Sequence, residues 1–192
     1  MPHLGVLLGV APHAGGMFQY AQSLLAALGA LPQDRFRVSA AFADPLWKAF
    51  LARYRFEPLS LPAGQLSLRM AEAMLALRIP GPVCRTLAPW INPAARAMIS
   101  ARCDLWLFPA QDILAYQAPV PALVAVHDLM HRYERRFPEV ASSGRYAARE
   151  QRFSGIARSA KSMLVDSEVG RQQFVESYGA DPGRIFPLPY VT

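Results

Sequence analysis

Short apolar runs alternate with helix-like segments along almost the whole chain of 192 residues. A continuous apolar run is typical of a strand that is buried on both faces, as strands of a parallel sheet are. Strands that alternate with helices predict such a sheet, with helices packed on both of its faces. The pattern therefore predicts a doubly wound α/β fold with a mainly parallel sheet, and the length suits a single domain over residues 1–192.

The elements can be placed from these runs and from the residues that break them. Ser167 is a good N-cap for the last helix, and Pro80-Gly81-Pro82 breaks an earlier one. The predicted strands cover residues 4–10, 35–43, 56–61, 104–108, 121–127, 161–165 and 184–191. The predicted helices cover a segment ending at Gly29, then residues 45–53, 67–79, 93–101, 144–159 and 167–178.

Composition excludes several classes of protein. Apolar residues make up 53% of the chain and charged residues 18%, which argues against disorder. No apolar run approaches the roughly 20 residues of a membrane span, and residues 1–10 lack the features of a signal peptide. We therefore expect a cytoplasmic protein. Cys84 and Cys103 are isolated from any histidine cluster, so no metal site, disulfide framework or cofactor is implied.

Gly15 and Gly16 stand between the first predicted strand and its helix. A helix N-terminus attracts anions, and glycines let a phosphate approach the backbone closely. The same pair also suits a tight turn with no ligand. The full three-glycine dinucleotide fingerprint and the P-loop pattern are both missing, which counts against a nicotinamide cofactor and a P-loop nucleotide site.

His127 and Asp128 follow the buried run 121–127. A polar pair at the end of such a strand is costly unless it is hydrogen-bonded or functional. His127 could donate to a sugar hydroxyl or phosphate oxygen, and Asp128 could orient it. A His–Asp pair that only closes a turn is the alternative.

Arginines are dense in the following segment, and the net charge is +6. Helical geometry places Arg145, Arg149 and Arg152 in one sector, with Arg132 shortly before them. Such a face can be merely solvated, or it can hold an anionic acceptor or a lipid surface. Nucleic acid is a weaker candidate, because no helix-turn-helix or zinc signature accompanies the charge.

Three stretches together resemble the amino-terminal half of a GT-B glycosyltransferase, which has two facing Rossmann-like domains. They are APHAGGMFQYAQSLLAAL (11–28), VPALVAVHDLMHRY (120–133) and ARSAKSMLVDSEVGRQQFVESYGADPGRIFPLPYVT (157–192). They resemble, in turn, the family's glycine-rich first loop with its helix, the strand ending in His-Asp, and the strand–Ser–helix segment before the interdomain linker. The likeness is to the large retaining families conventionally numbered 1 and 4.

The resemblance implies transfer of a sugar from a nucleotide-sugar donor to an acceptor, with the anomeric configuration retained. It implies that Gly15 and Gly16 approach the donor diphosphate, that His127 contacts the transferred sugar and that Asp128 shapes that loop. It places a sugar, lipid-linked or other acceptor near Arg132, Arg145, Arg149 and Arg152, with peripheral contact to the inner membrane face as an option.

In this family the nucleotide lies mainly in a second domain, which residues 1–192 do not include. We therefore expect negligible transferase activity from this chain alone. Two other hypotheses stay open at this point. One is a binding module without chemistry, for a nucleotide or an acidic surface, and the other is a dinucleotide-dependent oxidoreductase domain.

Overall fold

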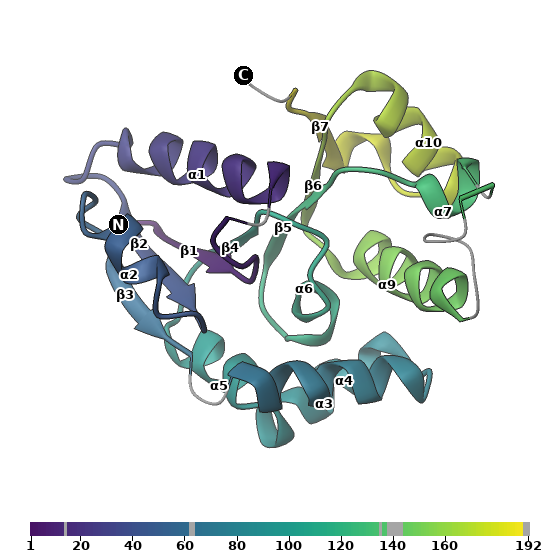
Figure 1. The fold of residues 1–192 in the computed structure, drawn as a ribbon, viewed down its shortest axis with the longest axis horizontal. Coiled ribbons are helices and arrows are strands. Elements are labelled where there is room, and N and C mark those ends of the chain that lie inside the picture. The colour runs from purple at the N-terminus through teal and green to yellow at the C-terminus, as the bar shows by residue number, and fades with distance from the viewer. Residues whose placement is uncertain (14, 62–63, 135, 138–143, 190–192) are drawn as a thin grey trace.

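The computed structural model describes residues 1–13, 15–61, 64–134, 136–137 and 144–189. Within these residues, the centre of the fold is a seven-stranded sheet in the order β3-β2-β1-β4-β5-β6-β7, with every neighbouring pair parallel (Figure 1). The strands are β1 (His3–Leu8), β2 (Arg37–Phe42), β3 (Glu57–Ser60), β4 (Leu105–Phe108), β5 (Ala122–Val126), β6 (Ser162–Val165) and β7 (Ile185–Pro187).

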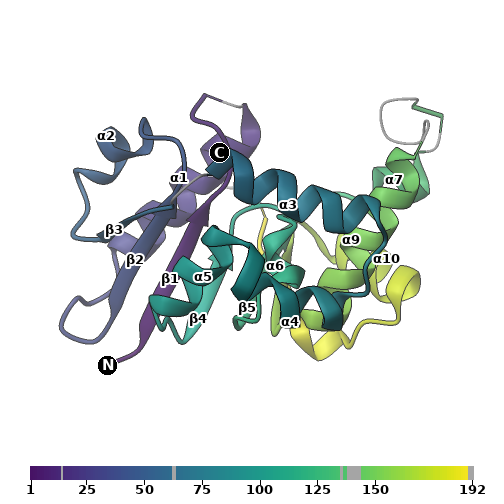
Figure 2. The same ribbon diagram turned by 90° about the horizontal axis from the view of Figure 1, so that it is seen from below.

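Helices cover both faces of this sheet. The long helices are α1 (Gly16–Gly29), α3 (Gly64–Ala76), α4 (Gly81–Ile91), α5 (Pro93–Ser100), α9 (Arg145–Ser159) and α10 (Glu168–Tyr178). The short ones are α2 (Trp47–Leu51), α6 (Leu114–Gln117), α7 (Met130–Tyr133) and the 3₁₀ turn η1 (Pro182–Arg184). Helices α1 and α2 pack on one face, and α3 to α6 and α9 on the other (Figures 1 and 2).

The predicted α/β Rossmann-like fold, doubly wound and parallel, is confirmed. Each face has its own apolar core because side chains of a strand alternate between faces. Val6 and Leu8 of β1 pack under α1, whereas Leu7 faces the core beneath α3 and α5. Within the described part of the chain, no helix is both long and apolar enough to cross a bilayer.

The strand order reverses beside β1. From β1 the chain moves outward through β2 to β3, then returns to β4 on the opposite side of β1 and continues outward to β7. The connections that leave β1 and β4 therefore diverge to opposite faces. In an open parallel sheet, this divergence leaves a crevice beyond the carboxyl ends of the two strands.

Several element boundaries differ from those predicted. The sequence Pro80-Gly81-Pro82 separates two helices, as expected, but it also begins α4, which was not predicted. Proline is tolerated there because the first helical residues have no intrahelical N–H bond to lose. Ser167 caps α10 as predicted, by accepting from the Gly170 amide at 3.1 Å. The last strand is shorter than predicted, and the end of its predicted range, at 190–191, lies outside the described residues.

Substitution of Gly5 by alanine tests the close approach of β1 to β4. A methyl group at Gly5 would lie 2.5 Å from the Trp106 ring, and Trp106 is fully buried. We expect Gly5→Ala to lower the free energy of unfolding in urea by about 1–3 kcal/mol through overpacking. Gly170→Ala is the control, because its methyl group meets nothing closer than 3.6 Å and improves helix propensity. Equal stability of the two variants would contradict this packing.

Candidate functional site

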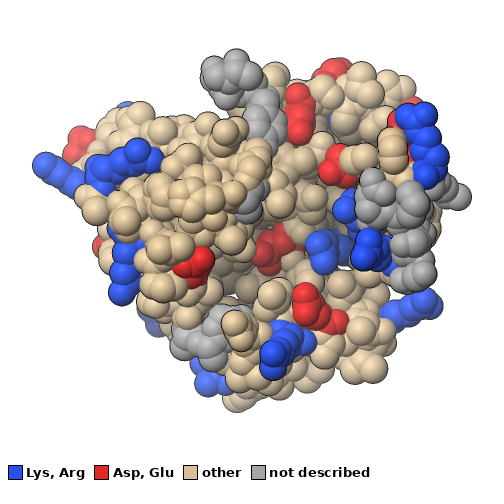
Figure 3. Space-filling view, viewed as in Figure 1, with Lys and Arg blue, Asp and Glu red and all other residues tan. Residues whose placement is uncertain are grey.

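Two adjoining hollows form a cleft beyond the carboxyl ends of β1 and β4, where the strand order reverses. One has a volume of about 500 Å³ and the other about 580 Å³, within the range of small-molecule sites. The hollows share the carboxyl end of β1 and its loop, Leu68 of α3, and Asp112 and Ile113 after β4. We call this combined space the switch-point cleft. Figure 3 shows acidic and basic side chains around a hollow near the middle of this face.

The two halves of the cleft differ in chemistry. Glu72, Arg149 and Arg152 line only the first hollow, Asp44 lines only the second, and Asp112 lines both. The second is mainly apolar, and its lining includes Leu61, Leu68, Ala71, Ala94 and Leu114. The cleft can therefore hold a molecule that presents polar or charged groups at one end and an apolar face at the other.

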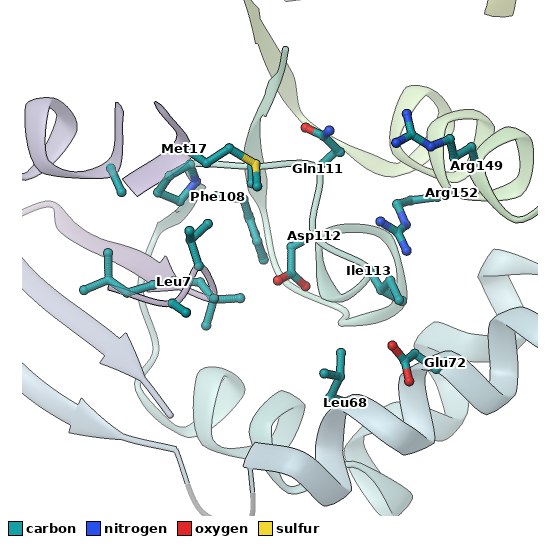
Figure 4. Close-up of a pocket in the computed structure, with 17 residues that line it drawn as sticks. Leu7, Met17, Leu68, Glu72, Phe108, Gln111, Asp112, Ile113, Arg149 and Arg152 are labelled. Carbon is teal, nitrogen blue, oxygen red and sulfur yellow. The ribbon is translucent and has the colours of Figure 1, made fainter. Parts of the chain in front are cut away.

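Asp112 stands at the centre of the cleft (Figure 4). One carboxylate oxygen, Oδ1, accepts from the Leu114 amide at 2.8 Å, which fixes the side chain. The other oxygen approaches Gly9 so closely that a Cβ there would lie 2.6 Å away. Burial raises the pKa of this carboxyl, while the Leu114 amide and Arg152 oppose that shift. The carboxyl is thus suited to exchange hydrogen bonds with a bound hydroxyl.

Arg149 and Arg152 reach the cleft from α9, one turn apart (Figure 4). The Nε of Arg152 is buried and, among the described residues, has no hydrogen-bond partner. Burial lowers the pKa of this guanidinium, and the Asp112 carboxylate partly offsets that effect. A desolvated guanidinium with an unused donor is a strong binding group for an anion that can enter.

The glycine pair lies at the start of α1, and Met17 and Ala21 of the same helix line the cleft. Gly15 has φ 65° and ψ −143°, a backbone conformation that side chains oppose. Gly15 supplies no side-chain cap, and the first turn of the helix contains no acidic residue. The positive end of the helix dipole therefore lies beside the cleft without a compensating carboxylate in its first turn.

His127 follows β5 and lies beneath α1 rather than among the residues that line the two hollows. Its Nε2 donates to the Pro109 carbonyl at 2.9 Å, and its Nδ1 is 3.2 Å from Oδ1 of Asp166. The Tyr20 ring packs edge-on against it at 4.7 Å between centroids. Because Pro109 itself lines the cleft, His127 supports the cleft wall in this conformation.

Asp128 links the loop after β5 to helix α9. Its Oδ1 accepts from the Met130 amide at 3.0 Å and pairs with Nη1 of Arg149 at 3.5 Å. The hydrogen bond from Met130 closes a turn, which is the role expected of a His–Asp pair that has no ligand. The ion pair with Arg149 holds this cleft arginine in place.

The two other predicted arginines do not line the cleft hollows. Arg132 forms a two-pronged ion pair with Glu150, at 2.6 and 2.5 Å, and stacks over the Tyr178 ring. Burial raises the pKa of Glu150, but the hydrogen bonds from Arg132 and Tyr178, together with the charges of Arg132 and His131, more than offset this and hold it below its ordinary value. Arg145 is exposed at the first turn of α9. The four arginines of the predicted basic face therefore lie in three environments: the cleft, the ion pair with Glu150 and the exposed surface.

Sequence reasoning missed the acidic groups of the cleft. Asp112 lies four residues beyond the end of β4, in a loop that the rule for parallel sheets already marked as a ligand position. Glu72 lies on α3, where no sequence pattern distinguished it from a solvated residue. Among the described residues, no group of three or more His, Cys, Asp or Glu side chains is placed to hold a metal ion.

The sequence matches no protein-family model and no curated protein. The fold resembles that of HepE (Alr3699) from Anabaena, solved in complex with UDP, with a TM-score of 0.52 and 14% identity over 98% of this chain and 44% of that one. A putative UDP-N-acetylglucosamine 2-epimerase from Listeria monocytogenes gives a TM-score of 0.48 and 14% identity over 96% and 43%. The chain thus spans less than half the length of either structure. The first likeness supports a GT-B-type fold.

Unfolding in urea tests whether Arg132 stabilises the fold and Arg152 does not. Arg132→Met leaves the half-buried Glu150 without its cation, so we expect a loss of about 2 kcal/mol in the free energy of unfolding. Arg152→Met removes a guanidinium with no ion-pair partner within 4 Å among the described residues, and we expect a change below about 1 kcal/mol. A loss at Arg152 as large as that at Arg132 would make Arg152 a structural residue.

Proposed function

We propose that this chain is the acceptor-side domain of a retaining glycosyltransferase that uses a nucleotide-sugar donor. The observation that carries the proposal is the switch-point cleft, which combines the N-terminal end of α1, two arginines and a carboxylate around one space. The GT-B-type fold, shared with a UDP-bound protein, supports a function related to nucleotide sugars.

In this proposal the donor diphosphate lies near Gly15 and Gly16, where backbone N–H groups and the helix dipole stabilise the charge that develops as the sugar leaves. Asp128 shapes the adjacent loop through its bond to the Met130 amide. His127 contacts the transferred sugar only if its ring exchanges the Pro109 or the Asp166 partner. We therefore assign it a role that depends on a rearrangement of the loop on binding.

The acceptor occupies the cleft itself. Arg149 and Arg152 bind an anionic group of the acceptor, and Asp112 accepts from its hydroxyls. The apolar half of the cleft packs against the less polar part of the molecule. A second Rossmann-like domain would hold most of the nucleotide, so we expect weak donor binding and negligible sugar transfer by residues 1–192 alone.

Donor binding is tested by NMR titration of the ¹⁵N-labelled chain with UDP-glucose and UDP-N-acetylglucosamine. We expect weak binding that shifts the amide signals of Gly9, Gly15 and Gly16, and no comparable binding of NADH. Tight binding of NADH without binding of either UDP-sugar would favour the oxidoreductase hypothesis. Turnover of a UDP-sugar by the pure chain would contradict the expected inactivity.

Met17→Asp is the matching variant, because Met17 lines the cleft and is 41% exposed in the first turn of α1. The new carboxylate would repel the diphosphate but would be favourable to the helix dipole, so folding should not suffer. We expect at least a tenfold weaker UDP-sugar affinity. Ala26→Asp adds the same charge to an exposed position farther along α1 and should leave the affinity unchanged. Equal affinities of both variants would exclude this end of α1 as the donor site.

A further inference from the structure

Three polar side-chain atoms in the charged part of the switch-point cleft are buried and have no hydrogen-bond partner among the described residues. They are Nη1 of Arg149, Nε of Arg152 and Oε1 of Gln111. All three residues line the first hollow, which has a volume of about 500 Å³. Buried polar atoms without a partner are costly. A ligand in this hollow can supply the missing partners, so these atoms indicate which groups it must carry.

The two guanidinium groups offer donors to one anionic group. Figure 4 shows Arg149 and Arg152, one turn apart on α9, at the same end of the cleft. Arg149 already forms an ion pair with Asp128, with 3.5 Å between Nη1 and Oδ1, so part of its charge is compensated. Arg152 has no such partner within 4 Å among the described residues. A planar carboxylate matches the fork of a guanidinium with two parallel hydrogen bonds.

The other polar groups of the first hollow accept hydrogen bonds. Glu72 and Asp112 contribute carboxylates, and Gln111 presents its unpartnered amide oxygen. One oxygen of Asp112 is bonded to the Leu114 amide, which leaves the other for a ligand. Carboxylate and amide oxygens accept but do not donate. The ligand must therefore carry O–H or N–H donors close to its anionic group, as the hydroxyls of a sugar are.

The charges around the first hollow favour a ligand with a single negative charge. Two guanidinium groups and two carboxylates line the hollow, so its lining has no excess of positive charge. The Arg152 guanidinium interacts electrostatically with both Asp112 and Glu72. A phosphate monoester carries close to two negative charges at neutral pH, and these carboxylates would repel the second charge with no further cation to offset it. A carboxylate group carries one charge and avoids this cost.

We propose that the first hollow binds a sugar acid, in which one carbon of the sugar is a carboxylate, and discriminates against the corresponding sugar phosphate. The carboxylate binds Arg149 and Arg152, and hydroxyls of the sugar donate to Gln111 and Asp112. Glu72 contributes to the discrimination by repelling a second negative charge. As an assignment of the acceptor, this inference rests on the proposed function, whereas as a binding site it rests on the hollow alone.

The test titrates the ¹⁵N-labelled chain with D-glucuronate and D-galacturonate, with neutral D-glucose and D-galactose, and with the 6-phosphates of both sugars. The two uronates differ only in the orientation of the 4-hydroxyl. We expect one uronate or both to bind at least about tenfold more tightly than the matching neutral sugar and the matching 6-phosphate. No binding of either uronate, or binding of each 6-phosphate as tight as that of its uronate, would overturn the proposal.

Variants locate the contact. Arg152→Met should lose at least about tenfold in uronate affinity. Arg158→Met removes an exposed guanidinium from the same helix, outside the lining of the cleft, and should bind as the wild type does. Glu72→Gln changes an exposed side chain of α3 and should bind the 6-phosphates at least about threefold more tightly, because a repelling charge is removed. Equal uronate affinities of the two arginine variants, or unchanged 6-phosphate affinity of Glu72→Gln, would contradict the assignment.

The result is separable from that of the titration with UDP-sugars. Uronate selectivity without binding of a UDP-sugar would support the sugar-acid site and count against the proposed sugar transfer. Binding of a UDP-sugar without uronate selectivity would leave the proposed function in place and overturn only the sugar acid as its acceptor.

Discussion

The hydrogen-bonded pairing of β1 with β2 on one side and β4 on the other is the constraint on which the rest of this structure depends. All strands are parallel, so the connection between two neighbouring strands must cross one face of the sheet. Successive connections lie on the same face only while the strand order continues in one direction. The order reverses at β1. The chain segments after β1 and β4 therefore part, and the space between them becomes the switch-point cleft.

Helix α9 shows how one amphipathic segment can serve two purposes. Its buried side contributes Phe153, Ile156 and Ala157 to the core. Its polar side divides, because Glu150 pairs with Arg132 on one flank while Arg149 and Arg152 face the cleft on the other. Removal of Arg132 would leave the half-buried Glu150 without its cation, whereas Arg152, which has no ion-pair partner within 4 Å among the described residues, is available to a ligand. Burial and pairing, rather than the count of arginines, separate the structural cations from the candidate binding groups.

Much of the architecture was predictable from local patterns. Continuous apolar runs marked the central strands β1, β4 and β5, because a strand buried on both faces has no polar side to interrupt it, and the other four strands were predicted from shorter or interrupted apolar segments. Ser167 marked the start of α10 through its hydroxyl, which can satisfy a free amide. Helix α4 escaped prediction because the two prolines around Gly81 were interpreted only as a break, although proline is equally compatible with a helix start.

The sequence by itself determined the fold class and the parallel sheet, because these follow from periodicities that each segment carries alone. It also marked the positions of Gly15, Gly16, His127, Asp128 and the arginines as chemically unusual. Only the tertiary structure decided which of them share a space. Asp112, Glu72, Arg149 and Arg152 come from three separate segments, and their meeting depends on strand order and helix packing. The tertiary structure also decided where the His127 ring points, because its hydrogen-bond partner, the Pro109 carbonyl, is distant in sequence.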